Sequence, residues 1–498
     1  MGKNAYGPPD KLASAIHILY IILFLIVVIQ FVASSEIRRL CYVALLLILA
    51  CLAAPFVLNA LANLGAEKGK WTIIILLSVC VLVKLAWVLI FRTEPASDYY
   101  TFYETAVKLS KSWQITDMGD AADIYYLAVF PHIMGYATFL SLFYKVFGTG
   151  LLVAPIVNVL LSAISMFFIY YIATRLLGNR AGIIASILWI FLPSQTIYNT
   201  MVLSEPYYTT LILAFFICLI KVSDAIKASR WVRIFLLALA SGVLLALVNA
   251  TRPLSVILII AMVISLVINV RRIDRKALVK KCTYLAVTAL LFIASIGINS
   301  SYCTSRLGQD AAGTAGYSIY VGFNEDASGS WNAEDAGALE AAVADQNGDA
   351  EQAQEQMLEV AKSRIFEGNI NFPKLFLEKI GVLWAHDSMA YYYSDIGGHE
   401  VLFVSVLDAY FYFTIIFSIV GLIAAIRRGD TSLILILVLY VLGLTAAHML
   451  VEVSARYHYS AIVPILILSA SGLSRAGRWK RIRSTADQAE DTGMAPAF

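Results

Sequence analysis

Charged side chains are scarce in this sequence. Of its 498 residues, 14% are Asp, Glu, Lys or Arg, whereas 60% are hydrophobic. A soluble protein of this length carries about a quarter charged residues, so a soluble enzyme and a disordered chain are both excluded. The 37 basic and 34 acidic residues nearly balance, and without a basic field no nucleic-acid partner is expected. The sequence therefore predicts a polytopic membrane protein.

Cysteine pairs and nucleotide-binding motifs are also missing. Five of the six cysteines lie in apolar runs, and no two have the spacing of a metal site or of a disulfide framework. The sequence contains no Walker A motif, no dinucleotide fingerprint, no HExxH and no GxSxG. We therefore expect no cofactor, and nothing in the sequence indicates a divalent metal.

Runs of about 20 apolar residues mark membrane spans. No small-residue cleavage site follows the first run, so we interpret it as a transmembrane helix and not as a cleaved signal peptide. The shorter run Pro131 to Phe147 contains polar residues, and we expect an interfacial or re-entrant helix there. The predicted fold is all-α, with about twelve transmembrane helices, interfacial helices and a small extracytoplasmic subdomain. The predicted spans are 14–34, 40–63, 71–91, 150–177, 181–198, 206–222, 234–250, 253–270, 282–299, 401–425, 431–449 and 459–474.

Lys and Arg in the short loops indicate the orientation of the spans. They gather in one set of loops and in the C-terminal tail, with Arg38 and Arg39 as the clear exception. We expect these loops and both termini to face the cytoplasm. The opposite side then carries the first long loop and the segment 300–400, which contains sixteen acidic and five basic residues.

The chain divides accordingly into five parts. The segment 300–400 is long enough for a small subdomain packed on the membrane part, but too short for a large independent domain. No internal repeat is present, which speaks against a transporter built from duplicated halves. The predicted parts are an additional N-terminal transmembrane pair (1–70), a transmembrane core (71–299) whose first external loop is 92–149, the extracytoplasmic segment (300–400), the C-terminal transmembrane helices (401–474) and a cytoplasmic basic tail (475–498).

Two acidic residues at the external ends of spans are candidates for a functional site. Asp98 follows the third span and stands next to Tyr99 and Tyr100. It is either a solvated loop aspartate or a general base that accepts a hydroxyl proton, with the tyrosines stacking on a sugar or a lipid headgroup. Glu205 begins the sixth span within a Ser-Glu-Pro sequence, which is also ordinary chemistry for a helix start.

Two arginines lie at the same predicted membrane face. Arg252 stands between two closely joined spans, where it either reaches the lipid headgroups or binds an anion or a carboxylate. Arg456 belongs to a short turn that also holds Tyr457 and His458, and the fixed fork of donors on its side chain suits a phosphate. His386, just before the tenth span, is either structural or part of a site.

Several short motifs follow one another along the chain: Ser97-Asp98-Tyr99-Tyr100, Phe130-Pro131, Phe147-Gly148, Pro193, Ser204-Glu205-Pro206, Thr251-Arg252-Pro253, the stretch from Tyr320 to Asn332, and Arg456-Tyr457 followed by Pro464. In this order, the motifs resemble the GT-C superfamily of membrane glycosyltransferases, and within it the bacterial relatives of protein O-mannosyltransferases and the lipid A aminoarabinose transferase. The resemblance covers nearly the whole chain. The chain departs from the family pattern in two ways. Two additional spans precede the external loop that carries Asp98. Asp98 is followed by Tyr99 and not by a second acid, which speaks against a metal-dependent mode.

This resemblance implies a polyprenyl-phosphate sugar as donor and a glycan, a lipid or a protein as acceptor, in contact with membrane lipids. It implies that Asp98 takes the acceptor proton, that Arg456 with Arg252 holds the leaving phosphate, and that a single displacement inverts the anomeric carbon. A bacterial plasma membrane with an extracytoplasmic active site is the expected location. The residues expected to bind substrate are Tyr99, Tyr100, Glu205, His386, Tyr457 and His458.

Other functions remain open on the sequence alone. A ligase or polymerase that moves a whole glycan from a lipid diphosphate would use the same arginines. A transporter or flippase of lipid-linked sugars would share the spans, but the short, merely basic cytoplasmic loops show no polar path. An acyltransferase needs an intramembrane histidine as base, for which His17 and His448 are poor candidates. A receptor role would not explain Arg252 and Arg456.

Overall fold

A computed structural model of the chain describes residues 11–117, 121–394, 396–427 and 432–475. Over these residues the regular secondary structure is entirely helical, and eleven helices are long and apolar enough to cross a membrane. An all-α polytopic membrane protein is therefore confirmed. The eleven are α1 (Lys11–Ser34), α2 (Ile37–Lys68), α3 (Lys70–Ile90), α7 (Val153–Leu177), α10 (Glu205–Lys227), α11 (Trp231–Thr251), α12 (Ser255–Asn269, prolonged by the 3-10 turn η2, Val270–Arg272), α13 (Arg275–Leu307), α19 (Glu400–Ile426), α20 (Ser432–Leu450) and the last span (Ala455–Arg475), which begins with the 3-10 helix η3 (Ala455–Ala461).

The predicted span 181–198 is wrong as a single helix. The structure divides it into α8 (Asn179–Ile190) and α9 (Pro193–Tyr198). Pro193 explains the break, because a proline disfavours helical torsion angles in the preceding residue, and Leu192 is extended with φ −67° and ψ 112°. Together the two helices still return the chain to the end where α3 finishes, since Thr200 there hydrogen-bonds Thr93 over 2.9 Å between their hydroxyl oxygens.

The run Pro131 to Phe147 forms one arm of a sharply bent helix pair. Between α4 (Asp98–Lys111) and α7, helices α5 (Ala121–Val129) and α6 (Ile133–Phe147) meet at an angle of 116°, and a 3-10 turn, η1 (Ile115–Asp117), precedes them. The hydroxyl of Tyr103 donates to the carbonyl oxygen of Thr149 over 2.9 Å. The chain thus enters and leaves this region at the same end of the bundle.

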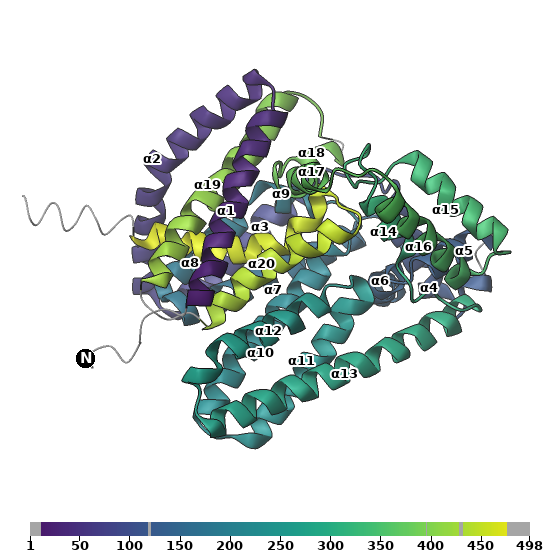
Figure 1. Cartoon of the computed structure of the whole chain (residues 1–498). Helices are drawn as coiled ribbons and strands as arrows, with labels where there is room; N and C mark the ends of the chain where they lie inside the picture. The colour runs from purple at the N-terminus through teal and green to yellow at the C-terminus, as the bar shows by residue number, and fades with distance from the viewer. Residues whose placement is uncertain (1–10, 118–120, 395, 428–431, 476–498) are drawn as a thin grey trace, which may run out of the picture.

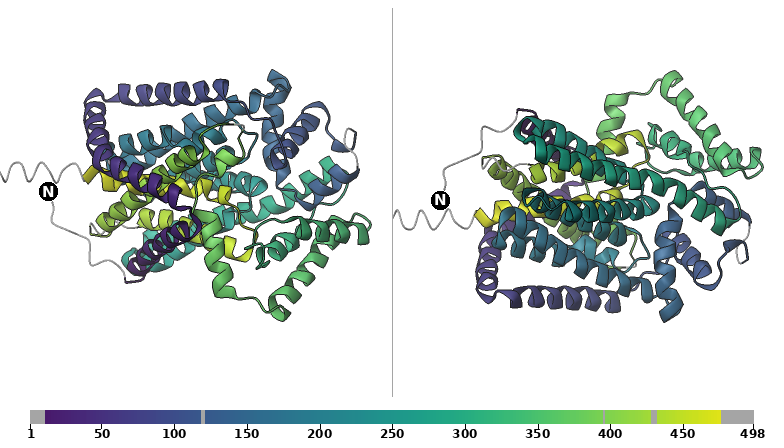
Figure 2. Two further views of the ribbon diagram at one scale, coloured as in Figure 1. Left: turned by 90° about the horizontal axis from the view of Figure 1, so that it is seen from above. Right: turned by 90° about the horizontal axis from the view of Figure 1, so that it is seen from below.

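Two groups of shorter helices gather at one end of the long helices, as Figures 1 and 2 show. We call α4–α6 together with α14–α16 the cap. In α16 the apolar side chains of Met357 and Ala361 lie in the interior. Helices α17 and α18 connect the cap to α19. The helices of this segment are α14 (Gly316–Gly322), α15 (Ala333–Asp345), α16 (Ala350–Glu367), α17 (Phe372–Trp384) and α18 (Met389–Tyr392).

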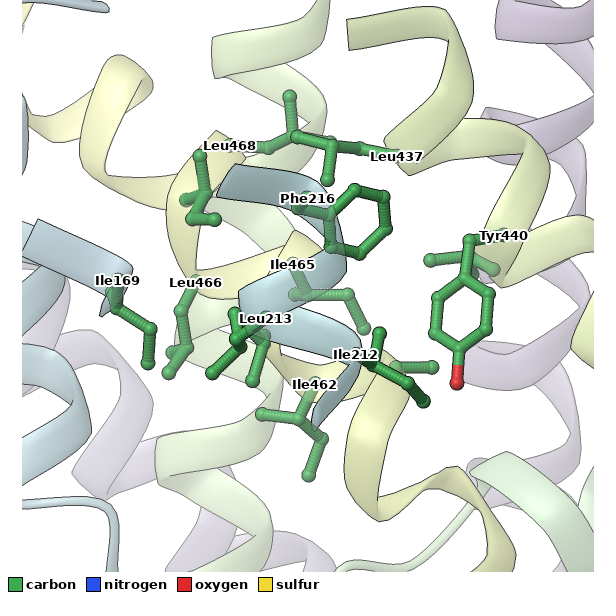
Figure 3. Close-up of a cluster of buried hydrophobic side chains, with 14 of the residues drawn as sticks. Ile169, Ile212, Leu213, Phe216, Leu437, Tyr440, Ile462, Ile465, Leu466 and Leu468 are labelled. Carbon is green, nitrogen blue, oxygen red and sulfur yellow. The ribbon is translucent and has the colours of Figure 1, made fainter. Parts of the chain in front are cut away.

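The core of the bundle lies where α10, α20 and the last span meet. Phe216 of α10 packs edge-on against Tyr440 of α20, with ring centroids 6.1 Å apart, and Ile462 and Ile465 of the last span complete the same cluster (Figure 3). The hydroxyls of Tyr440 and Ser460 hydrogen-bond over 2.7 Å. This packing fixes the last span, and therefore η3 at its start, against the middle of the bundle.

The N-terminal helix pair is part of the same bundle. Helix α2 runs along α19, and α1 packs on α17 and α20. The hydroxyls of Tyr20 and Ser418 hydrogen-bond over 2.9 Å, and Asn59 donates to the carbonyl oxygen of Leu473 over 2.9 Å. The first two helices therefore cover the C-terminal helices. Of the predicted basic tail, only Arg475 falls within the described residues.

Candidate active site

An ion pair between the cap and the last span forms the centre of the candidate site. Asp98 is the first residue of α4, directly after an irregular segment that ends at Ser97, and Arg456 is the second residue of η3. The Nη2 atom of Arg456 donates to Oδ2 of Asp98. The sequence predicted both residues at the external membrane face, and the structure joins them although 358 positions separate them.

A second ion pair lies beside the first. Nη2 of Arg252 is 3.3 Å from Oε1 of Glu205, whose side chain is only 1% exposed. Glu205 begins α10, and Arg252 stands in the short turn that follows α11. That turn is held by α6, because Gly135 lies so close to the end of α11 that a Cβ there would come within 2.1 Å of the carbonyl oxygen of Ala250.

Tyr457 links the two pairs. The Arg252 guanidinium lies 4.8 Å from the centroid of its ring, and that of Arg456 lies 5.5 Å from it. Such distances allow cation–π attraction to both arginines. The hydroxyl of Tyr457 donates to Oε1 of Glu452 over 3.1 Å, and His448 stacks on the ring with centroids 5.0 Å apart. One aromatic side chain therefore holds two cations at the same place.

The carboxyl groups of this site differ in their electrostatic surroundings. Burial favours a neutral carboxyl at Asp98, but the neighbouring charges of Arg456 and Arg252 outweigh it and hold the pKa of Asp98 below its usual value. At Glu452 burial prevails over the hydrogen bond from Tyr457, and the pKa is raised. Asp98 is therefore ionised at neutral pH, as a general base must be.

Both arginines keep unused hydrogen-bond donors. The Nε atoms of Arg456 and Arg252 are buried and have no hydrogen-bond partner among the described residues. The hydroxyl of Tyr99 is also buried and has no hydrogen-bond partner of good geometry among the described residues, and the Arg456 guanidinium lies 5.8 Å from its ring centroid. Buried donors normally find an acceptor, and phosphate oxygens are suited to arginine. The arrangement can therefore bind an anion next to an ionised carboxylate.

Two residues that hold the site together were not among the predicted site residues. Glu452 lies four residues before Arg456 in the sequence, in the same short connection between the last two spans. Lys379 gave no signal, because it lies in an ordinary amphipathic helix. Its buried ammonium group donates to three carbonyl oxygens, of Gly322 (2.6 Å), Val451 (2.8 Å) and Met449 (3.1 Å). It thereby ties the cap to the turn that carries Glu452.

Three predicted substrate-binding residues take no part in the two ion pairs. Tyr100 is half exposed on α4. His386 contacts Asp408 and Ser34, where α1 meets α19. His458 is buried between the rings of Trp384 and Phe411, with centroid distances of 5.3 and 5.5 Å. The structure thus brings together six of the nine predicted site residues, namely Asp98, Tyr99, Glu205, Arg252, Arg456 and Tyr457.

The acidic side chains of the site pair with other protein groups. Among the residues that the structure describes, no three His, Cys, Asp or Glu side chains lie close enough together to hold a metal ion. The acids that converge here are bound instead to Arg456, Arg252 and the Tyr457 hydroxyl.

Comparison with known families supports the resemblance to GT-C glycosyltransferases. Residues 132–298, about a third of the chain, match the family model of dolichyl-phosphate-mannose-protein mannosyltransferases, which confirms the resemblance to GT-C glycosyltransferases. Glu205 and Arg252 lie inside the matched segment, whereas Asp98 and Arg456 lie outside it. The match supports a glycosyltransferase. No curated protein matches the sequence significantly.

Among solved structures, the chain is similar to an archaeal oligosaccharyltransferase, AglB from Archaeoglobus fulgidus. Its complex with an inhibitory peptide and a dolichol-phosphate has a TM-score of 0.47 and 11% identity, over 86% of this chain and 53% of that one. Its apo form gives 0.46 and 11% over the same shares, and a form tethered to an acceptor peptide gives 0.46 and 10% over 82% and 50%. The chain thus spans about half the length of these proteins, and likeness at this level does not bear on its activity or substrates.

Proposed function

We propose that this protein is an inverting glycosyltransferase that moves a sugar from a polyprenyl-phosphate donor to an acceptor hydroxyl. The observation that carries the proposal is the convergence of two arginines with free buried donors beside an ionised aspartate. A lipid-linked donor places its phosphate at the membrane surface, where the capped ends of the long helices lie. The acceptor is a glycan, a lipid or a protein.

The proposed reaction is a single displacement at the anomeric carbon. The acceptor oxygen forms a bond to this carbon while the bond from the carbon to the phosphate oxygen breaks. Asp98 takes the acceptor proton, and the polyprenyl phosphate leaves with the additional negative charge. Arg456 and Arg252 stabilise that charge as it develops, which is the most effective contribution that fixed donors make to catalysis.

The ion pair between Asp98 and Arg456 couples donor binding to activation of the base. Without substrate, Arg456 holds the carboxylate and keeps the pKa of Asp98 low. A donor phosphate competes for the same guanidinium and frees Asp98 for the acceptor hydroxyl. The negative charge of the bound phosphate offsets the positive charge of Arg456 and so raises the proton affinity of Asp98 at the moment when it acts as base.

The charge pattern supports a plasma-membrane protein with its site on the extracytoplasmic face. The far ends of the long helices carry basic residues such as Lys68, Arg175 and Lys227, whereas the capped ends carry the candidate site. Positive residues favour the cytoplasmic side of a membrane. The absence of a nucleotide-binding motif from the sequence agrees with a lipid-linked donor.

A transfer assay tests the proposal. Purified protein in nanodiscs receives a panel of radiolabelled polyprenyl-phosphate sugars and a crude envelope extract as acceptor. We expect label to leave the lipid with the wild type and the Asp123→Asn variant, but not with Asp98→Asn. Equal turnover in the Asp98 variant would keep the enzyme class and overturn the assigned base. Binding without transfer of any donor would favour a transporter, and transfer only from lipid diphosphates would favour a ligase.

A further inference from the structure

The buried pair His458 and Asp387 has no role in the proposed reaction, although His458 directly follows Arg456 and Tyr457 on η3. Nδ1 of His458 lies 2.5 Å from the carbonyl oxygen of Leu383, and Nε2 lies 3.1 Å from Oδ1 of Asp387. Both side chains are at most 3% exposed, and rings stack on both sides of the imidazole. Substrate therefore has no access to this pair.

The contacts of His458 determine how many protons the pair holds. A carbonyl oxygen only accepts hydrogen bonds, so Nδ1 carries a proton. Nε2 either carries a second proton and donates it to an ionised Asp387, or accepts one from a protonated Asp387. A neutral imidazole beside an ionised carboxylate is disfavoured, because it would place a lone pair of Nε2 3.1 Å from a lone pair of Oδ1 of Asp387. In both favoured arrangements the pair therefore holds one proton more than that combination.

The surroundings of Asp387 favour retention of this proton. Its Oδ2 atom is buried and has no hydrogen-bond partner of good geometry among the described residues. Burial also raises the pKa of Asp387, since an ionised carboxylate with an unsatisfied oxygen is costly in the interior.

An ion pair from the N-terminal helices supports the same loop. The backbone N–H of Asp387 donates to Oδ1 of Asp408, which is fully buried. Arg39 of α2 holds Asp408 through Nε at 2.9 Å and Nη2 at 2.5 Å, and Nη2 also donates to Ser388 over 2.7 Å. Arg39 lies outside the loops in which the other basic residues gather. It neutralises the buried Asp408 and fixes the loop that holds His458.

We propose that Asp387 and His458 are positioning residues that share one retained proton and fix η3 in the orientation that presents Arg456. Arg456 and Tyr457 directly precede His458 on the same 3-10 helix, so the orientation of His458 determines theirs. The inference rests on the proposed function for its binding and activity measurements, but not for its measurement of local structure.

The test compares Asp387→Asn with Asp387→Ala. An Asn side chain donates an N–H to Nε2 of a neutral His458 and so replaces the shared proton, whereas Ala cannot. We expect the Asn variant to bind polyprenyl phosphate and to transfer sugar within about twofold of the wild type. In the Ala variant we expect polyprenyl-phosphate binding to weaken, and kcat/KM to fall by about ten- to a hundredfold, as when a catalytic group is misplaced by about 1 Å.

Backbone hydrogen exchange of residues 455–461 decides the inference without substrate. We expect faster exchange there in Asp387→Ala and wild-type rates in Asp387→Asn. Unchanged exchange in the Ala variant, or equal loss of binding in both variants, would overturn the positioning role. If Asp387→Ala does not fold, loss of binding by Asp387→Asn alone would overturn it. If the wild type binds no polyprenyl phosphate, the proposed function fails, and the exchange result still decides this inference.

Discussion

Replacement of Asp98 by Asn is expected to change the catalytic rate and the affinity for the donor in opposite directions. Asn has nearly the same size as Asp but cannot accept the acceptor proton, and loss of a general base lowers kcat by about 10²- to 10⁴-fold. Asn also carries no charge, so the donor phosphate no longer competes with a carboxylate for Arg456. Binding of polyprenyl phosphate should therefore become tighter.

The size of this gain follows from the exposure of the ion pair. The Asp98 side chain is 42% exposed, and that of Arg456 is 11% exposed. Solvent screens a half-exposed pair, which is worth about 0.5–1 kcal/mol. Removal of this competitor corresponds to binding that is about two- to fivefold tighter.

The assay is a titration of the protein in nanodiscs with polyprenyl phosphate that carries no sugar, followed by the change in tryptophan fluorescence. Asp123→Asn is a matched control, because Asp123 is also 42% exposed and pairs with Lys108 on the cap. This control should bind the lipid as the wild type does. Weaker binding by the Asp98 variant would show that Asp98 supports the donor and does not compete with it, and would refute the coupling between donor binding and release of the base.

Two further predictions concern stability. Arg252→Met leaves the buried carboxylate of Glu205 without its arginine, so the free energy of unfolding should fall by about 3 kcal/mol. The double variant Arg252→Met with Glu205→Gln should recover most of this loss. Denaturant unfolding in detergent measures the stability of each protein, and equal stability of the wild type and both variants would contradict the prediction. Burial raises the pKa of Glu452, so the stabilisation from its protonated form is complete below the usual carboxyl pKa and is lost as pH rises through the raised pKa. Glu452→Gln keeps an acceptor for Tyr457 and should lose less thermal stability between acid and neutral pH than the wild type, and a parallel loss in both would refute the assignment.

The transmembrane architecture was accessible from the sequence because long apolar runs and basic loops follow directly from the physics of the bilayer. The site residues at the ends of spans could be predicted from the sequence for a related reason. Polar residues such as Asp98, Arg252 and Arg456 stand where apolar runs stop, and the topology places these positions at one end of the bundle. Their pairing was not predictable, because it depends on how the cap packs against the last span.

The predictions that failed, and the residue that gave no signal, have specific physical explanations. His458 follows Arg456 and Tyr457 in sequence, but a 3-10 helix has three residues per turn, so successive side chains point in different directions and His458 faces the interior. The break at Pro193 lies inside a run that is apolar on both sides, so hydropathy alone does not reveal it. Lys379 is recognised only when three carbonyl oxygens from two distant segments meet its ammonium group.

The ion pairs at the capped end join parts of the chain that are far apart in sequence, and this has a consequence for folding. Asp98 with Arg456 connects the cap to the last span, and Arg39 with Asp408 connects α2 to α19. The carboxylate of Asp408 is fully buried, and a buried charge without its partner is costly, so α19 is not fully stable until α2 has packed against it. The pair of Arg252 with the buried Glu205 carries the same cost within the phosphate site, so replacement of one of these two residues will change stability together with activity unless both are replaced.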